Sequence, residues 1–249
     1  MFFCIDYNYY LCGKLYIMGE GVHTIGKGKR SEVKDTEKGL NKQEAYTVRK
    51  LEKQIRNLEY EKGYVIGSDG KVLAESVYGD KSSARFNPKD YAKMKDAVIT
   101  HNHPYAGEEG TLNNTIAGRI GVPFSDADII MAIVRNAKEV RAVTPTYTYS
   151  IRRPKGGWNA NIKDTRTLME FQKDVKNWNR RMKRRINQYS NQQAYASGKY
   201  LTKNNLWNDR EIDKRSREVS DRGNVGIQYG MVKELAKKYG FEFTRKRVK

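Results

Sequence analysis

Two of the three histidines of this 249-residue chain lie two positions apart, directly after an apolar segment. Residues 98–100 (Val-Ile-Thr) are β-branched, which is typical of a strand, and they lead into His101, Asn102 and His103. Because alternate residues of a strand face the same side of a sheet, we expect the two imidazoles side by side. Two imidazoles and a carboxylate from elsewhere in the chain would form a three-ligand zinc site with a fourth position open to water. An open site of this kind is typical of catalysis.

The candidate carboxylate is Asp128, which follows Ser125 by three residues. A serine followed at this distance by an acid is the pattern of a helix capping box, and an acid in the first turn also suits the helix dipole. This structural role is sufficient to explain both residues. It is compatible with a second role, in which Asp128 binds a metal from the helix start and Ser125 directs its hydroxyl at the site.

The sequence around these motifs alternates between strand and helix patterns, so we predict an α/β fold. Apolar residues recur at helical spacing from residue 41 to residue 58. Strands are expected at 64–67, 72–77, 97–100, 139–143 and 146–151, with short helices at 87–95 and 125–137. Residues 41–153 therefore form one predicted domain. Residues 1–40, rich in Gly, Lys and Glu towards their end, are interpreted as a flexible lead-in.

The C-terminal part is predicted to be a basic α-helical extension over residues 154–249. A long amphipathic helix is expected at 168–186 and a short one at 231–239, and residues 241–243 could add a strand. Residues 151–249 contain 26 Lys and Arg against 10 Asp and Glu, out of a net charge of +19 for the whole chain. Such asymmetry favours a polyanionic partner, either nucleic acid or an acidic protein. The alternative is a Lys-rich solvated helical tail.

Composition excludes several other classes of protein. The only cysteines are Cys4 and Cys12, which form no disulfide framework, so a reducing, cytoplasmic compartment is expected. No apolar run approaches the ~18–20 residues needed to span a bilayer, and no secretory signal pattern is present. We therefore expect no membrane partner.

The order of these motifs resembles the JAMM (MPN-type) zinc metalloprotease family. A strand ending in His-Asn-His-Pro, followed by a loop and Ser-x-x-Asp-Ile at a helix start, is most similar to the RadC-like branch and to the JAMM domains of phage head-associated proteins. The resemblance covers roughly residues 45–150. It implies a cytidine-deaminase-like mixed sheet flanked by helices, Zn²⁺ bound by His101, His103 and Asp128, and Ser125 as a stabiliser of the oxyanion.

The family also requires an upstream glutamate that takes up and returns the proton of the attacking water. Glu61 precedes an apolar strand as in the family pattern, although the glycine that follows is one residue closer than usual. Glu59 is the second candidate and Glu75 the third, and a solvated helix-end role is the structural alternative for Glu61. The loop at 105–124 is longer than in the family, and it could form a lid, read the substrate or displace Asp128.

The resemblance implies a zinc-dependent peptide or isopeptide hydrolase, encoded by a phage or mobile element. Its expected substrate is a conjugated or capsid-associated protein, in the bacterial host cytoplasm or on the virion. One alternative is a non-catalytic JAMM-fold module that binds nucleic acid or an acidic protein through residues 154–249. Another is a toxin or effector domain that acts on host proteins. Trp158, Trp178 and Trp207 could stack on bases, although the position of Trp178 favours a place in the core.

Overall fold

The computed structural model describes residues 38–80, 83–104, 121–158, 166–178 and 228–248, with isolated positions between 180 and 226. Its elements are α2 (Lys42–Ile55), β1 (Gly63–Ile66), β2 (Val72–Glu75), β3 (Tyr78–Gly79), β4 (Ala84–Arg85), the 3₁₀ helix η1 (Pro88–Met94), β5 (Val98–Asn102), α4 (Asp126–Val134), β6 (Glu139–Val143), β7 (Tyr147–Arg152) and β8 (Glu242–Arg247). Two further helical segments cover residues 166–178 and 228–239.

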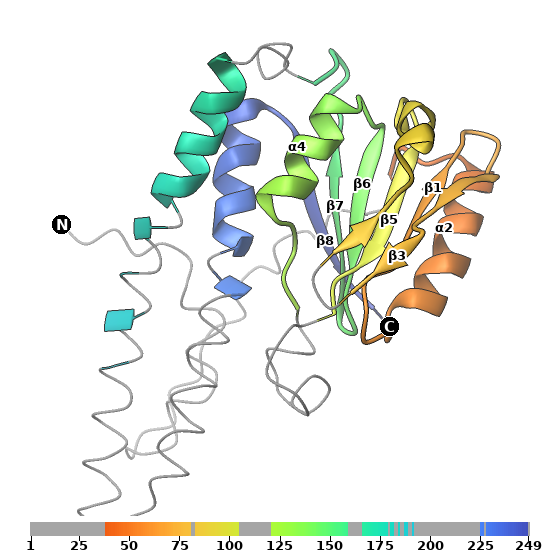
Figure 1. Ribbon diagram of the computed structural model, residues 1–249, viewed down its shortest axis with the longest axis horizontal. Coiled ribbons are helices and arrows are strands. Elements are labelled where there is room, and N and C mark those ends of the chain that lie inside the picture. Colours follow the sequence, from red (N-terminus) through yellow and green to blue (C-terminus); the bar gives the residue numbers. More distant parts are fainter. Residues whose placement is uncertain are drawn as a thin grey trace, which may run out of the picture. The chain divides into compact units, whose positions relative to one another are not determined.

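A mixed six-stranded sheet in the order β2-β1-β5-β6-β7-β8 forms the centre of the fold (Figure 1). Strands β5 and β6 are parallel, and every other neighbouring pair is antiparallel. Parallel neighbours need a crossover connection, and the chain between β5 and β6 contains α4. The predicted α/β class with a mixed sheet flanked by helices is confirmed at this level.

Helices cover both faces of the sheet. On one face, α4 and the helical segments 166–178 and 228–239 share a core with Ile99 of β5 and Val140 of β6. On the other face, α2 packs against Ile66 of β1 and Val98 of β5. The alternation of Val98 and Ile99 follows the strand period of two. His101 therefore shares the face of Ile99 and α4, whereas Asn102 belongs to the opposite face.

The first helix begins where the sequence places a cap. Asn41 accepts a hydrogen bond from the Glu44 backbone N–H at 2.9 Å, and the Glu44 side chain accepts one from Asn41 N at 2.8 Å. This reciprocal pair satisfies two of the donors that a helix start leaves unpaired. The helix ends at Ile55, slightly before the predicted limit at residue 58.

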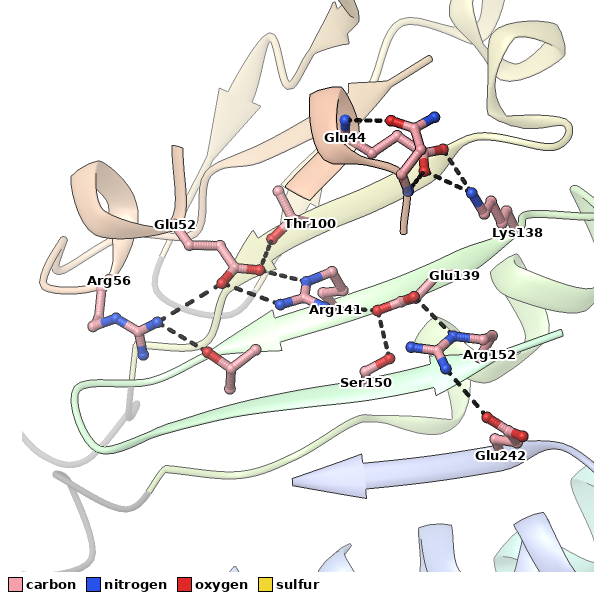
Figure 2. Close-up of polar contacts among 12 residues, drawn as sticks. Glu44, Glu52, Arg56, Thr100, Lys138, Glu139, Arg141, Ser150, Arg152 and Glu242 are labelled. Atoms are coloured by element: carbon pink, nitrogen blue, oxygen red, sulfur yellow. Dashed lines mark hydrogen bonds and ion pairs between the residues drawn. The ribbon is translucent and has the colours of Figure 1, made fainter. Parts of the chain in front are cut away.

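A buried network of charged side chains lies between α2 and the sheet (Figure 2). The Arg141 guanidinium donates to Glu52 of α2 at 2.6 Å and to Glu139 at 2.7 Å. Glu139 also accepts hydrogen bonds from Ser150 at 2.7 Å and from Arg152 at 3.0 Å. The side chains of Glu52, Glu139 and Arg141 are all at most 5% exposed. One helix and two neighbouring strands are thus joined by compensated charges.

The sheet takes its last strand from the C-terminal part of the chain. Strand β8 pairs with β7 from Glu242 opposite Arg152 to Arg247 opposite Tyr147. The strand expected at 241–243 is present and extends to Arg247. The Arg245 guanidinium lies over the Tyr147 ring, 4.8 Å from its centroid, and this cation–π contact stabilises a charged side chain within the sheet. Residues 242–247 therefore belong to the same sheet as β1, β5, β6 and β7.

The predicted lead-in at 1–40 lies outside the described residues, apart from positions 38–40. Among the helices that the structure describes, none combines the length and apolar character needed to cross a bilayer.

Candidate metal centre

The two histidines lie side by side at the end of β5, as predicted. His101 is 4% exposed and His103 is 6% exposed. Their ring centroids are 4.6 Å apart with an interplanar angle of 64°, and their Nε2 atoms approach to 2.7 Å. Both rings therefore direct a nitrogen lone pair or N–H at the same point on the α4 side of the sheet.

Asp128 joins them from the first turn of α4. Its Oδ1 atom is 3.2 Å from His101 Nε2, and its Oδ2 atom is 3.5 Å from His103 Nε2. A zinc ion with ligands at 2.0–2.1 Å in tetrahedral geometry keeps them about 3.3 Å apart. The two distances to Asp128 match this spacing, whereas the two Nε2 atoms, 2.7 Å apart, would have to separate for zinc to bind. The three side chains thus form a group that could hold a metal ion, with two nitrogen donors and one oxygen donor. The long preceding loop has not displaced Asp128 from the histidines.

The capping box of α4 fixes the position of the Asp128 carboxylate. Ser125 is the N-cap, and its backbone N–H and its hydroxyl each donate to Asp128 Oδ2 at 2.8 Å. The Asp128 backbone N–H donates back to Ser125 Oγ at 3.3 Å. The structural and metal-facing roles expected for Asp128 are therefore compatible in one conformation. The single hydroxyl hydrogen of Ser125 is directed at Asp128, so the predicted oxyanion role would require it to rotate.

A backbone carbonyl sets the orientation of His103. The His103 Nδ1 atom lies 3.0 Å from the Val122 carbonyl oxygen, which can only accept, so Nδ1 carries the hydrogen. The neutral ring then has its lone pair on Nε2, which faces Asp128 and His101. Gly121 precedes Val122 with φ +63°, and a Cβ there would lie 2.4 Å from the Thr144 side chain. Glycine is required for this close approach.

Electrostatics at the site favour a positive charge. Burial would lower the pKa of His103, but the hydrogen bond and charge of Asp128 outweigh burial and raise that pKa to about 9. For Asp128 burial acts in the opposite direction and would raise the pKa, but the neighbouring His101 and His103 hold that pKa well below its usual range. A carboxylate that stabilises positive charge on the adjacent His103 ring is also suited to a bound cation.

Glu61 lies two residues before the start of β1. Gly63, two residues later, is the register partner of His101 in the neighbouring strand. Burial raises the pKa of the half-buried Glu61 carboxyl, and the charges of His103 and His101 partly offset that rise. The carboxyl group is therefore within electrostatic range of the predicted ligands, and its shifted pKa suits proton transfer.

The two alternative glutamates have different surroundings. Glu59 is exposed. Glu75 is half exposed and forms an ion pair with Lys62 at 2.6 Å. The Glu61 carboxyl interacts electrostatically with His103, His101 and Asp128.

Two features of the site were not predicted from the sequence. One is the Val122 carbonyl, since a backbone group leaves no residue-type signal. The other is Asn102, which lies between the histidines in the chain but is fully buried on the opposite face. Its amide contacts the backbone on either side of Glu61, at Tyr60 and Lys62. A polar residue at an inward position of a strand is a signal that could have identified it.

The structure describes two of the three tryptophans that were considered for stacking on nucleic-acid bases. Trp158 is 5% exposed and donates from Nε1 to the Ala137 carbonyl at 2.7 Å, so its ring belongs to the core. Trp178 is partly buried against the same core, as its helix position predicted. Trp207 and the loop residues 105–120, with their expected lid or substrate-reading role, lie outside the described residues.

Comparison with known proteins gives no family assignment: no family model matches the chain, and no curated protein or solved structure is significantly similar to it. The function must therefore be argued from the site itself.

Proposed function

We propose that this chain is a JAMM-type zinc hydrolase that cleaves peptide or isopeptide bonds. The observation that carries the proposal is the convergence of His101, His103 and Asp128 on one point, within electrostatic range of the Glu61 carboxyl. Two imidazoles and one carboxylate match the three protein ligands of an open catalytic zinc site.

Each residue has a defined chemical role in the proposed reaction. Zinc, when bound, polarises the scissile carbonyl and lowers the pKa of a neighbouring water to roughly 7. Glu61 accepts a proton from the water as its oxygen bonds to the carbonyl carbon, and then delivers that proton to the departing amine nitrogen as the C–N bond breaks. Ser125 holds Asp128 in place, and rotation of its hydroxyl would provide a donor for the oxyanion.

The family assignment is supported by the agreement between motif order and topology. The His-x-His pair ends a central strand, and Ser-x-x-Asp opens the helix of the crossover that follows, as the resemblance implies. A conjugated or capsid-associated protein of a phage or mobile element is the substrate class that this resemblance favours.

A non-catalytic binding module is the second candidate, and one surface feature favours it. Cationic side chains at 173, 176, 180 and 184 are exposed and recur at helical spacing. A basic row of this kind could bind nucleic acid or an acidic protein. In this case, DNA binding would weaken steeply as salt rises, and the protein would be stable without zinc.

Removal of zinc should abolish cleavage, and its return should restore it. The measurement is a proteome-wide cleavage screen with the zinc-loaded chain, the chelator-treated chain and the chelated chain supplied again with zinc. Asp128→Ala should also be inactive because it removes a ligand. Asp126→Ala is the matched control, since Asp126 is an exposed acid in the same helical turn. Cleavage that persists after complete chelation would contradict the proposal.

A further inference from the structure

Asn102 holds the segment that carries Glu61. Its side-chain Oδ1 accepts a hydrogen bond from Lys62 N at 2.7 Å, and its Nδ2 donates to the Tyr60 carbonyl at 2.8 Å. The Leu58 carbonyl lies 3.4 Å from the same Nδ2. One buried amide therefore binds the backbone on both sides of Glu61.

The backbone completes this arrangement from two directions. Asn102 N donates to the Lys62 carbonyl at 3.2 Å, and Glu61 N donates to the Asp80 carbonyl at 2.7 Å. The backbone at Gly79, next to Asp80, lies very close to the Glu61 backbone: a Cβ at Gly79 would be 1.7 Å from the Glu61 carbonyl oxygen. The backbone of Glu61 is thus held between β5 and the end of β3.

An amide is required for this pattern of contacts. The asparagine side chain supplies one acceptor oxygen and two N–H donors. The oxygen pairs with the Lys62 N–H, and the amide nitrogen faces the carbonyls of Tyr60 and Leu58. Residues 57–62, between α2 and β1, lie outside both elements, so the Asn102 side chain supplements the few backbone hydrogen bonds that hold them. Asn102→Ala would remove the side-chain partner of these part-buried backbone groups.

We propose that Asn102 is a positioning residue that holds the Glu61 carboxyl in place against the metal centre. The proposal rests on the proposed hydrolase function, because it assigns Glu61 the proton-transfer role. His101 and His103 project to one face of β5 while Asn102 binds the Glu61 segment from the other. One tripeptide thereby sets the distance between the metal ligands and the base. Displacement of a catalytic group by about 1 Å can cost 100-fold in rate.

The kinetic test combines Asn102→Ala with Glu61→Gln in a double-mutant cycle. We expect Asn102→Ala to lower kcat at least 10-fold, with KM and zinc content nearly unchanged. In the Glu61→Gln background the same change should have no further effect on residual kcat, because the group that it positions is already gone. Losses that multiply in the double variant, or loss of zinc, would overturn the proposal. Asn41→Ala is the matched control, since Asn41 also binds a backbone N–H and a carbonyl, at the start of α2.

Amide hydrogen exchange tests the same residue without any hydrolysis. We expect Asn102→Ala to accelerate exchange of the Lys62 and Glu61 amides at least 10-fold, while Ile99 and Val140 in the sheet stay protected. Unchanged exchange at Lys62 and Glu61, or equal acceleration throughout the sheet, would overturn the positioning role. If the wild-type chain cleaves nothing, the proposed function fails, and this exchange pattern still decides whether Asn102 holds the segment.

Discussion

Glu61→Gln should lower hydrolysis at least 100-fold and leave the metal bound. The substitution keeps the shape of the side chain but removes the group that accepts and returns the proton, a contribution of about 10²–10⁴ in rate. Glu61 is not among the three converging ligands, so zinc affinity should be nearly unchanged. The measurement is kcat on a substrate from the cleavage screen, together with zinc content by elemental mass spectrometry.

Two matched controls separate this role from the general loss of an acid near the site. Glu59→Gln changes an exposed side chain two residues away, and Glu75→Gln changes the partner of Lys62. Both variants should retain wild-type turnover within about twofold. Normal turnover by Glu61→Gln, with activity lost in Glu59→Gln instead, would transfer the role to the second candidate.

Arg141→Met should reduce the free energy of unfolding by about 3–5 kcal/mol. The guanidinium lies between Glu52 and Glu139, whose carboxylates it neutralises in the interior (Figure 2). Its removal leaves two buried carboxylates with reduced compensation: Arg152 and Ser150 remain on Glu139, and Arg56 remains 3.9 Å from Glu52. The pKa of Arg141 is raised because Glu52 and Glu139 outweigh its burial, so the pair interactions are strong.

Urea denaturation measures this effect, with Lys53→Met as the control. Lys53 is an exposed cation on the same helix as Glu52, and its loss should cost less than about 0.5 kcal/mol. A loss below about 1 kcal/mol for Arg141→Met would show that the network contributes little to stability. Because the network lies on the α2 face, the folded variant should still bind zinc.

The parts of the site that follow local sequence rules could be predicted. Strand alternation placed His101 beside His103, and the capping pattern placed Asp128 at a helix start. Their convergence could not be derived from spacing, because it depends on how the crossover returns α4 to the sheet. The resemblance to a known family implied that step, and the structure places Asp128 Oδ1 3.2 Å from His101 Nε2.

The omissions share a physical cause, because the pattern of a single sequence does not show which charged and polar residues find buried partners. The basic residues of β8 lie in the region predicted as a basic helical extension, yet the strand pairs with β7 and its Arg245 lies over the rings of Tyr147 and Tyr229. Arg141 and Asn102 lie in otherwise apolar strands, and both are buried with partners far away in sequence. Long-range partners of this kind leave no periodic signal in a single sequence.

Zinc stoichiometry tests the central claim most directly. Native mass spectrometry and elemental analysis of the purified chain should find one zinc ion per chain, and the same for Asp126→Ala. The double variant His101→Ala/His103→Ala should contain none, because it loses two of three ligands. A folded wild-type chain that binds no zinc, or a double variant that keeps it at full occupancy, would contradict the account.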